Sequence, residues 1–252
     1  MAKKIKVSRK QIKKPDEFVT TTERILKWLG ERKPLVYGVI SGLVLIILLV
    51  NLTAYSLRNR RLQAEFLLAR AFSVLKTPLI DELTVDQIIK GTKSYATSEE
   101  RRQDAIEKFK EVVSRFGASE QGLEARFHLG TLYLEQKDWE NAIYWFNDFL
   151  EKLSKRERAQ TTAFKLTAYL GLAKAYYGKG EYEQALKYYQ KVLESKDKTY
   201  LPEANLGLAR TLIKLKKTEE AKKKLKKILD DYPDSIYARL AQLELKNIEA
   251  GK

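Results

Sequence analysis

Three segments of the chain repeat one pattern of small and large apolar residues, and this pattern restricts the possible folds more than any other feature. At equal offsets, each segment has a Leu, a small residue, a large apolar residue, an Ala and a second large apolar residue. The three sets are Leu129, Gly130, Tyr133, Ala142 and Phe146; Leu172, Ala173, Tyr176, Ala185 and Tyr189; and Leu208, Ala209, Leu212, Ala221 and Leu225. Two antiparallel helices need small residues where they cross closely and large ones where space remains. Because one such pair cannot bury its apolar face alone, we expect several pairs to stack.

The pattern resembles the tetratricopeptide repeat, an all-α fold, over roughly residues 100 to 235. The resemblance implies repeat units at about 56–117 (with an insertion at 77–99), 123–156, 166–199 and 202–235, followed by a capping helix at 235–250. Two features depart from the family pattern. The aromatic residue expected early in the first helix is Tyr169 in one unit, but Arg126 and Asn205 in the others. Unit starts are 43 and 36 residues apart, whereas the family repeats about every 34 residues.

Residues 35–55, LVYGVISGLVLIILLVNLTAY, carry no charge. As a helix they would extend about 31 Å, which matches the roughly 30 Å hydrocarbon thickness of a bilayer. A cleaved secretory signal and a buried core helix are the alternatives. Against a signal, 34 residues precede the stretch, it is longer than a signal's apolar region, and no Ala-x-Ala site follows. We therefore expect an all-α chain: a single N-terminal transmembrane helix, then a tetratricopeptide-like α-solenoid (56–252) with a C-terminal capping helix.

The net charge of +15 is concentrated near the apolar stretch. Residues 1–34 hold eleven Lys or Arg against four acidic residues, and residues 35–62 hold three against none. Anionic headgroups and membrane topology explain basic residues beside a span, so we expect no nucleic-acid partner. We expect residues 1–34 to form a basic head that contains a short amphipathic helix and contacts anionic lipid.

The same charges bear on orientation. Within fifteen residues of the stretch, each side has four basic residues: Arg24, Lys27, Arg32 and Lys33 before it, and Arg58, Arg60, Arg61 and Arg70 after it. Over the whole flanks the N-terminal side is richer, which favours an N-terminus in the cytoplasm. The repeat domain is then expected in the periplasm of a bacterium.

Few residues of the chain are suited to catalysis. There is no cysteine, which excludes disulfides, thiolate nucleophiles and Cys-ligated metals. His128 is the only histidine, and one histidine makes neither a metal site nor a catalytic triad. Gly-rich phosphate loops, Gly-x-Ser-x-Gly and His-Glu-x-x-His motifs are absent from the sequence. We expect no enzymatic activity, no cofactor and no metal.

The first helices of stacked pairs line a groove, in which we expect proteins or peptide segments to bind. By register, nine residues face this groove: Phe127, Thr131, Leu134, Leu170, Lys174, Tyr177, Leu206, Arg210 and Ile213. Phe127, Leu170 and Leu206 are predicted to form an exposed apolar strip. Chaperone-binding members of the family hold a peptide carboxylate with Lys and Asn on this surface, so the apolar residues favour an apolar segment of a protein instead. Packing of some of these residues against the capping helix is the alternative.

A second charged feature is the run KLKKTEEAKKKLKKIL, residues 214–229, with eight lysines against two glutamates. It is interpreted either as a solvated helix face or as a docking surface for an acidic partner or lipid headgroups.

The architecture of the whole chain resembles the ancillary subunits of the SecYEG translocon, a family of bacterial inner-membrane proteins with a periplasmic tetratricopeptide-like domain. The resemblance implies a non-enzymatic, membrane-anchored interaction scaffold that assists the translocon and periplasmic chaperones with newly translocated proteins. Two alternatives are an envelope structural or assembly factor, working with cell-division or outer-membrane machinery, and a cytoplasm-facing tetratricopeptide receptor.

Overall fold

The computed structural model describes residues 17–155, 161–195 and 197–250. These residues form eleven α-helices and one short 3-10 helix, with a single isolated β-bridge and no strand, so the expected all-α fold is confirmed. By internal contacts the chain divides into two compact units, residues 1–60 and 61–252.

The N-terminal unit contains α1 (Glu17–Glu31) and the first part of α2 (Lys33–Lys76). Pro34 lies in the first turn of α2, where its missing N–H leaves no helical hydrogen bond unmade. The apolar stretch lies wholly inside α2. Its most apolar 18-residue window has a mean hydropathy of 2.6, and none of it is buried. By length and composition, α2 is therefore suited to cross a membrane, and no other helix in the described ranges is.

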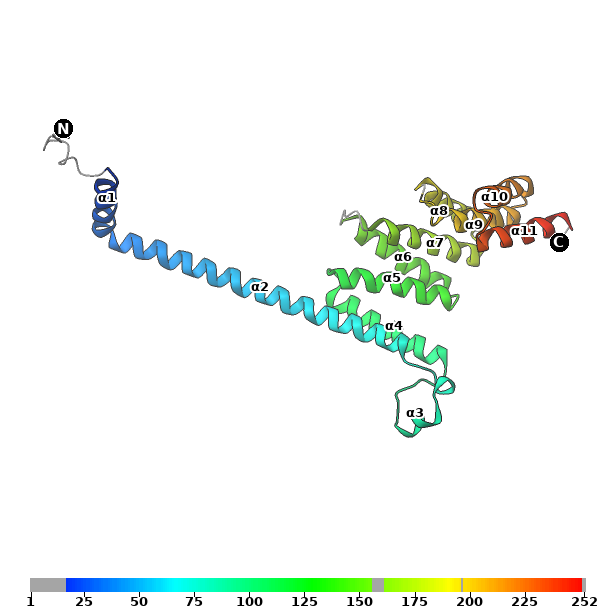
Figure 1. Cartoon of the computed structure of the whole chain (residues 1–252), viewed down its shortest axis with the longest axis horizontal. Coiled ribbons are helices and arrows are strands. Elements are labelled where there is room, and N and C mark those ends of the chain that lie inside the picture. The colour runs from blue at the N-terminus through cyan, green and yellow to red at the C-terminus, as the bar shows by residue number, and fades with distance from the viewer. Residues whose placement is uncertain (1–16, 156–160, 196, 251–252) are drawn as a thin grey trace, which may run out of the picture. The chain divides into compact units, whose positions relative to one another are not determined.

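The second unit contains the remaining part of α2 and a succession of helices. They are α4 (Ser98–Phe116), α5 (Glu120–Glu135), α6 (Trp139–Ser154), α7 (Thr161–Lys179), α8 (Tyr182–Glu194), α9 (Leu201–Lys214), α10 (Thr218–Asp231) and α11 (Ile236–Glu249). Between α2 and α4 lie the 3-10 helix η1 (Ile80–Glu82) and the short helix α3 (Val85–Ile89). From α4 onward each helix packs against the next in the chain, and α5, α7, α9 and α11 also pack in series (Figure 1).

The repeated residues lie where the helices cross, as the sequence pattern predicts. Ala142, Ala185 and Ala221 are completely buried. A Cβ atom on Gly130 would come within 2.7 Å of the Phe146 ring, so only glycine allows α5 and α6 to approach this closely. The tetratricopeptide pattern therefore reflects tight packing within each pair.

The turns within the pairs repeat a backbone feature. Lys137, Gly180 and Lys216 all have positive φ, at 60°, 87° and 59°. Each lies eight residues after the repeated Leu of its unit, between the first helix and the second. Glycine adopts this left-handed conformation without cost, whereas the two lysines are strained in it.

Candidate protein-binding surface

The structure places the nine predicted groove residues on α5, α7 and α9, but it buries three of them. Phe127 is 9% exposed, Leu170 3% and Leu206 4%. The prediction that these three form an exposed apolar strip is therefore wrong. The other six are half-buried or exposed: Thr131, Leu134, Lys174, Tyr177, Arg210 and Ile213.

Packing between successive pairs explains the burial. The Phe127 ring lies 5.4 Å from the ring of Phe149 on α6 and 5.3 Å from that of Phe164 on α7, so the next pair covers it. Leu170 and Leu206 both belong to the hydrophobic core formed by the last two pairs and α11. Packing between neighbouring units therefore covers three of the nine predicted groove positions and leaves the other six accessible.

Two ion pairs, one between α7 and α9 and one between α9 and α11, lie on this surface where an apolar strip was expected. Lys174 on α7 approaches Glu203 on α9, with 2.5 Å between Nζ and Oε1. Arg210 on α9 approaches Glu244 on α11, with 2.8 Å between Nε and Oε1. Both cations keep more than two fifths of their side chains exposed. This surface is therefore largely polar, and its half-buried hydrophobic members are Leu134, Tyr177 and Ile213.

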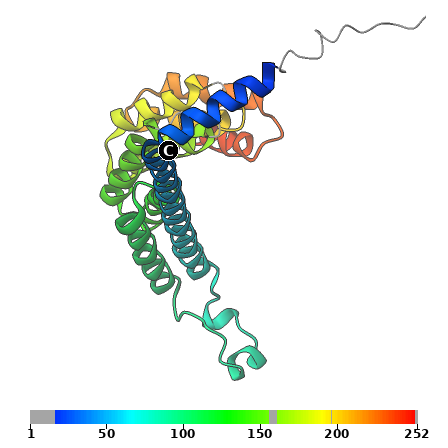
Figure 2. The same cartoon turned by 90° about the vertical axis from the view of Figure 1, so that its left-hand side faces the viewer.

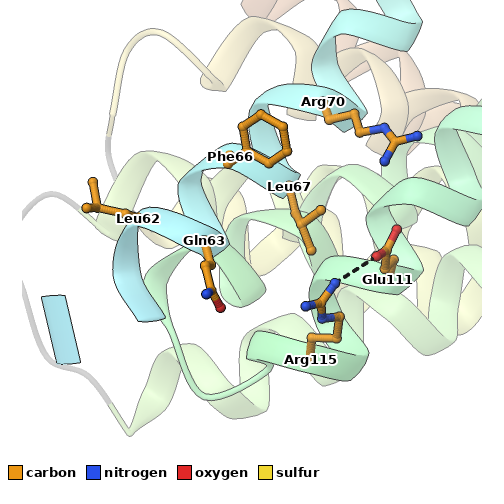
Figure 3. A pocket seen from close by; sticks show the side chains of 7 residues that line it. All are labelled: Leu62, Gln63, Phe66, Leu67, Arg70, Glu111 and Arg115. Atoms are coloured by element: carbon orange, nitrogen blue, oxygen red, sulfur yellow. Dashed lines mark hydrogen bonds and ion pairs between the residues drawn. The ribbon is translucent and has the colours of Figure 1, made fainter. Parts of the chain in front are cut away.

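A hollow of about 530 Å³, which the sequence pattern did not predict, lies beside α2 (Figure 3). Its lining consists of Leu62, Gln63, Phe66, Leu67 and Arg70 from α2, and Glu111 and Arg115 from α4. Leu62 and Phe66 are 55% and 68% exposed, and Glu111 and Arg115 form an ion pair one turn apart on α4 at 3.1 Å. Exposed apolar side chains beside a hollow are typical of contact surfaces, so this is a second candidate. Residues 62–75 have apolar side chains on all sides of the helix, so the sequence alone does not show which of them border the hollow.

The departure from the family pattern at Arg126 has a structural reason. Its guanidinium donates to Asp148 of α6 at 2.5 Å and to the backbone carbonyls of Gly117 and Gly122, both at 2.9 Å. It thus joins the α4–α5 connection to α6, at the position where the next unit has the aromatic Tyr169. Asn205, the other departure, donates to the Leu201 carbonyl at 3.0 Å within α9.

His128 lies among aromatic rings, as expected of a packed imidazole. Its ring is 4.7 Å from that of Phe72 and is stacked 5.4 Å from that of Phe109. Burial lowers the pKa of His128 below its usual value. Within the described ranges, no group of three or more His, Asp or Glu side chains is arranged to hold a metal ion.

One sequence model of the tetratricopeptide repeat matches residues 96–157 and 168–236, which is just over half of the chain, and another matches residues 128–198. The chain belongs to the tetratricopeptide repeat family. A search of curated proteins found no match.

Two solved structures show how the tetratricopeptide chain compares in three dimensions. A tetratricopeptide repeat protein from Parabacteroides merdae is 21% identical, with a TM-score of 0.51, over 75% of this chain and 60% of that one. The nearly identical TPR-like repeats of a Podosopora anserina protein are 18% identical, with a TM-score of 0.49, over 61% of this chain and 83% of that one. At 21% identity, the similarity to the Parabacteroides merdae structure shows a shared fold and nothing more.

Proposed function

We propose that the protein is a non-enzymatic scaffold, anchored in a membrane by α2, that holds other proteins on its repeat domain. The observation that carries the proposal is the presence in one chain of a span-length apolar helix and a tetratricopeptide solenoid. Solenoids present extended surfaces that suit protein ligands. An anchor keeps those ligands near the membrane.

The proposed partner surface is the face of α5, α7 and α9 that remains accessible after Phe127, Leu170 and Leu206 are buried. Its cations Lys174 and Arg210 are held in place by their acidic neighbours, but keep exposed area for a ligand. Partners on this face should therefore be polar or charged segments rather than purely apolar ones. The sequence alone favours an apolar ligand, so the structure changes the kind of ligand that we propose.

For the cellular setting, we propose the bacterial inner membrane, with the head in the cytoplasm and the repeat domain in the periplasm. The excess of positive charge in residues 1–34 supports this orientation. Protease added to spheroplasts should then digest the repeat domain. Survival of that domain, while other outward-facing proteins are digested, would instead favour the cytoplasm-facing receptor.

The proposed partners are translocon subunits and periplasmic chaperones, by architectural resemblance to ancillary translocon subunits. The test is chemical crosslinking of intact membranes that contain the tagged full chain, with an unrelated tagged single-span protein as the control. Enrichment of translocon and chaperone proteins would support this role. Enrichment of division or outer-membrane assembly proteins would support the envelope assembly factor, and no enrichment over the control would oppose any scaffold.

A further inference from the structure

The insertion between α2 and α4 exposes more aliphatic side chains than a solvated connection needs. Within residues 77–97, the exposed fractions are 52% for Ile80, 73% for Val85, 50% for Ile88 and 78% for Ile89. Figures 1 and 2 show α3 set apart from the stacked helices α4–α11. The repeat domain therefore leaves these side chains uncovered.

Specific hydrogen bonds hold the base of the insertion. The Ile80 amide donates to the Tyr95 carbonyl at 2.9 Å, and the Tyr95 amide donates to the Pro78 carbonyl at 3.1 Å. The buried Tyr95 donates its hydroxyl to Asp104 of α4. Burial and this hydrogen bond raise the pKa of Tyr95 to about 12, so the hydroxyl remains a donor at neutral pH. Arg101 of α4 also donates to the Thr77 carbonyl at 2.9 Å.

Local contacts also form α3 itself. Thr84 and Gln87 make a capping box, in which the Thr84 side chain accepts from the Gln87 amide and the Gln87 side chain accepts from the Thr84 amide. Lys90 pairs with Asp86 one turn earlier at 2.7 Å. A five-residue helix has little stability of its own, so these contacts prepare its shape before any partner arrives.

We propose that α3 is a further docking element, which inserts Val85, Ile88 and Ile89 into an apolar groove on a partner protein. Their i, i+3, i+4 spacing places them on one face of the helix, as in helices that bind grooves. Long ordered insertions in compact domains are usually functional. This inference goes beyond the proposed function, because it concerns a surface separate from the faces of α5, α7 and α9.

Charge favours a protein partner over a lipid surface. Residues 77–97 contain Asp81, Glu82 and Asp86 against Lys90 and Lys93, and their one aromatic residue, Tyr95, is buried. An anionic bilayer would repel this segment, and interfacial anchors usually carry Trp, Tyr or basic residues. The groove is therefore expected to have basic residues at its rim.

The experiment uses the absence of native cysteine to place single photocrosslinkers on the full chain. Ile89→Cys and Val85→Cys carry a benzophenone maleimide, and Leu243→Cys, an exposed aliphatic position on α11, is the matched control. After illumination in native membranes, adducts are identified by mass spectrometry. The adducted protein is then purified, and its affinity is measured for the full chain in nanodiscs.

The proposal expects one protein adduct from positions 85 and 89 that is absent from position 243, with its adducted residues in an apolar groove that has basic neighbours. Val85→Ser, Ile88→Ser and Ile89→Ser together should weaken that partner's binding about 100-fold. Leu243→Ser should leave the binding unchanged. Because the three side chains are exposed, the triple variant should melt within about 2 °C of the unmodified chain.

Three results would overturn the proposal: adducts with lipid alone, no protein adduct above the control, or a partner whose affinity survives the triple change. None of these three results tests the binding of proteins to the face of α5, α7 and α9, because that binding is proposed to depend on Lys174 and its neighbours. Retention of those partners by the triple variant separates a failure of this inference from a failure of the scaffold function.

Discussion

Arg126 gives the most quantitative test of the repeat packing. Its side chain is 9% exposed and that of its partner Asp148 is 19% exposed. Replacing Arg126 with Met keeps most of the apolar stem but leaves the carboxylate and the Gly117 carbonyl without the guanidinium. Loss of one partner of a buried ion pair costs about 3–5 kcal/mol.

Two features of the site reduce that figure. Lys152 lies 3.9 Å from the other oxygen of Asp148 and partly neutralises it. Asp148 also keeps some access to water. We therefore expect Arg126→Met to lower the free energy of unfolding by about 2–4 kcal/mol.

A double-mutant cycle isolates the interaction between the two side chains. Arg126→Met, Asp148→Leu and the double variant are prepared in the full chain in nanodiscs, and urea unfolding is followed by far-ultraviolet circular dichroism. Because an apolar pair can replace a buried ion pair at little cost, the double variant should be more stable than the sum of the single losses predicts, by at least about 1.5 kcal/mol. A loss below about 1 kcal/mol for Arg126→Met, or purely additive losses, would refute this reasoning.

Four further predictions use the same unfolding assay. Leu170→Ser should lower the free energy of unfolding by about 3 kcal/mol or more, because Leu170 is part of the core. A variant as stable as the original would instead indicate that Leu170 is exposed in an apolar strip. Ala142→Leu should cost about 1–3 kcal/mol by forcing α5 and α6 apart, and an unchanged stability would argue against close crossing there. Lys216→Gly should stabilise by up to about 1 kcal/mol by removing left-handed strain, whereas destabilisation would contradict that backbone conformation. Burial lowers the pKa of His128, so the unfolded chain binds a proton that the folded chain resists, and stability should fall as pH drops below about 6.5. His128→Phe should reduce that fall between pH values of about 7.5 and 5.5, and an identical pH dependence in the two proteins would contradict it.

Sequence spacing predicted the helix pairs because contacts within a pair depend on nearby residues. The offset from Gly130 to Phe146 is fixed by the two helices and their short turn, and the structure places these residues in contact. The residues that face the groove depend instead on the orientation of one helix pair relative to the next. Contacts such as that of Phe127 with Phe164 determine this orientation, and no spacing within one unit specifies them.

Two other surfaces could not be predicted for a related reason. Residues 62–75 have apolar side chains around the whole helix, so the sequence could not distinguish the buried Leu67 from the exposed Phe66. The insertion contains aliphatic residues that would suit a small core. Only the three-dimensional structure shows that Val85 and Ile89 remain exposed.

The central claim, that an anchored solenoid holds proteins on the face of its first helices, is tested most directly by blocking that face. Lys174→Cys carries a bulky maleimide there, and Gln190→Cys carries the same group on the exposed surface of α8. Binding of the crosslinked partner is then measured with the full chain in nanodiscs. We predict at least about tenfold weaker binding with the label at 174 and unchanged binding with the label at 190. Equal affinity for the two labelled proteins would contradict the account.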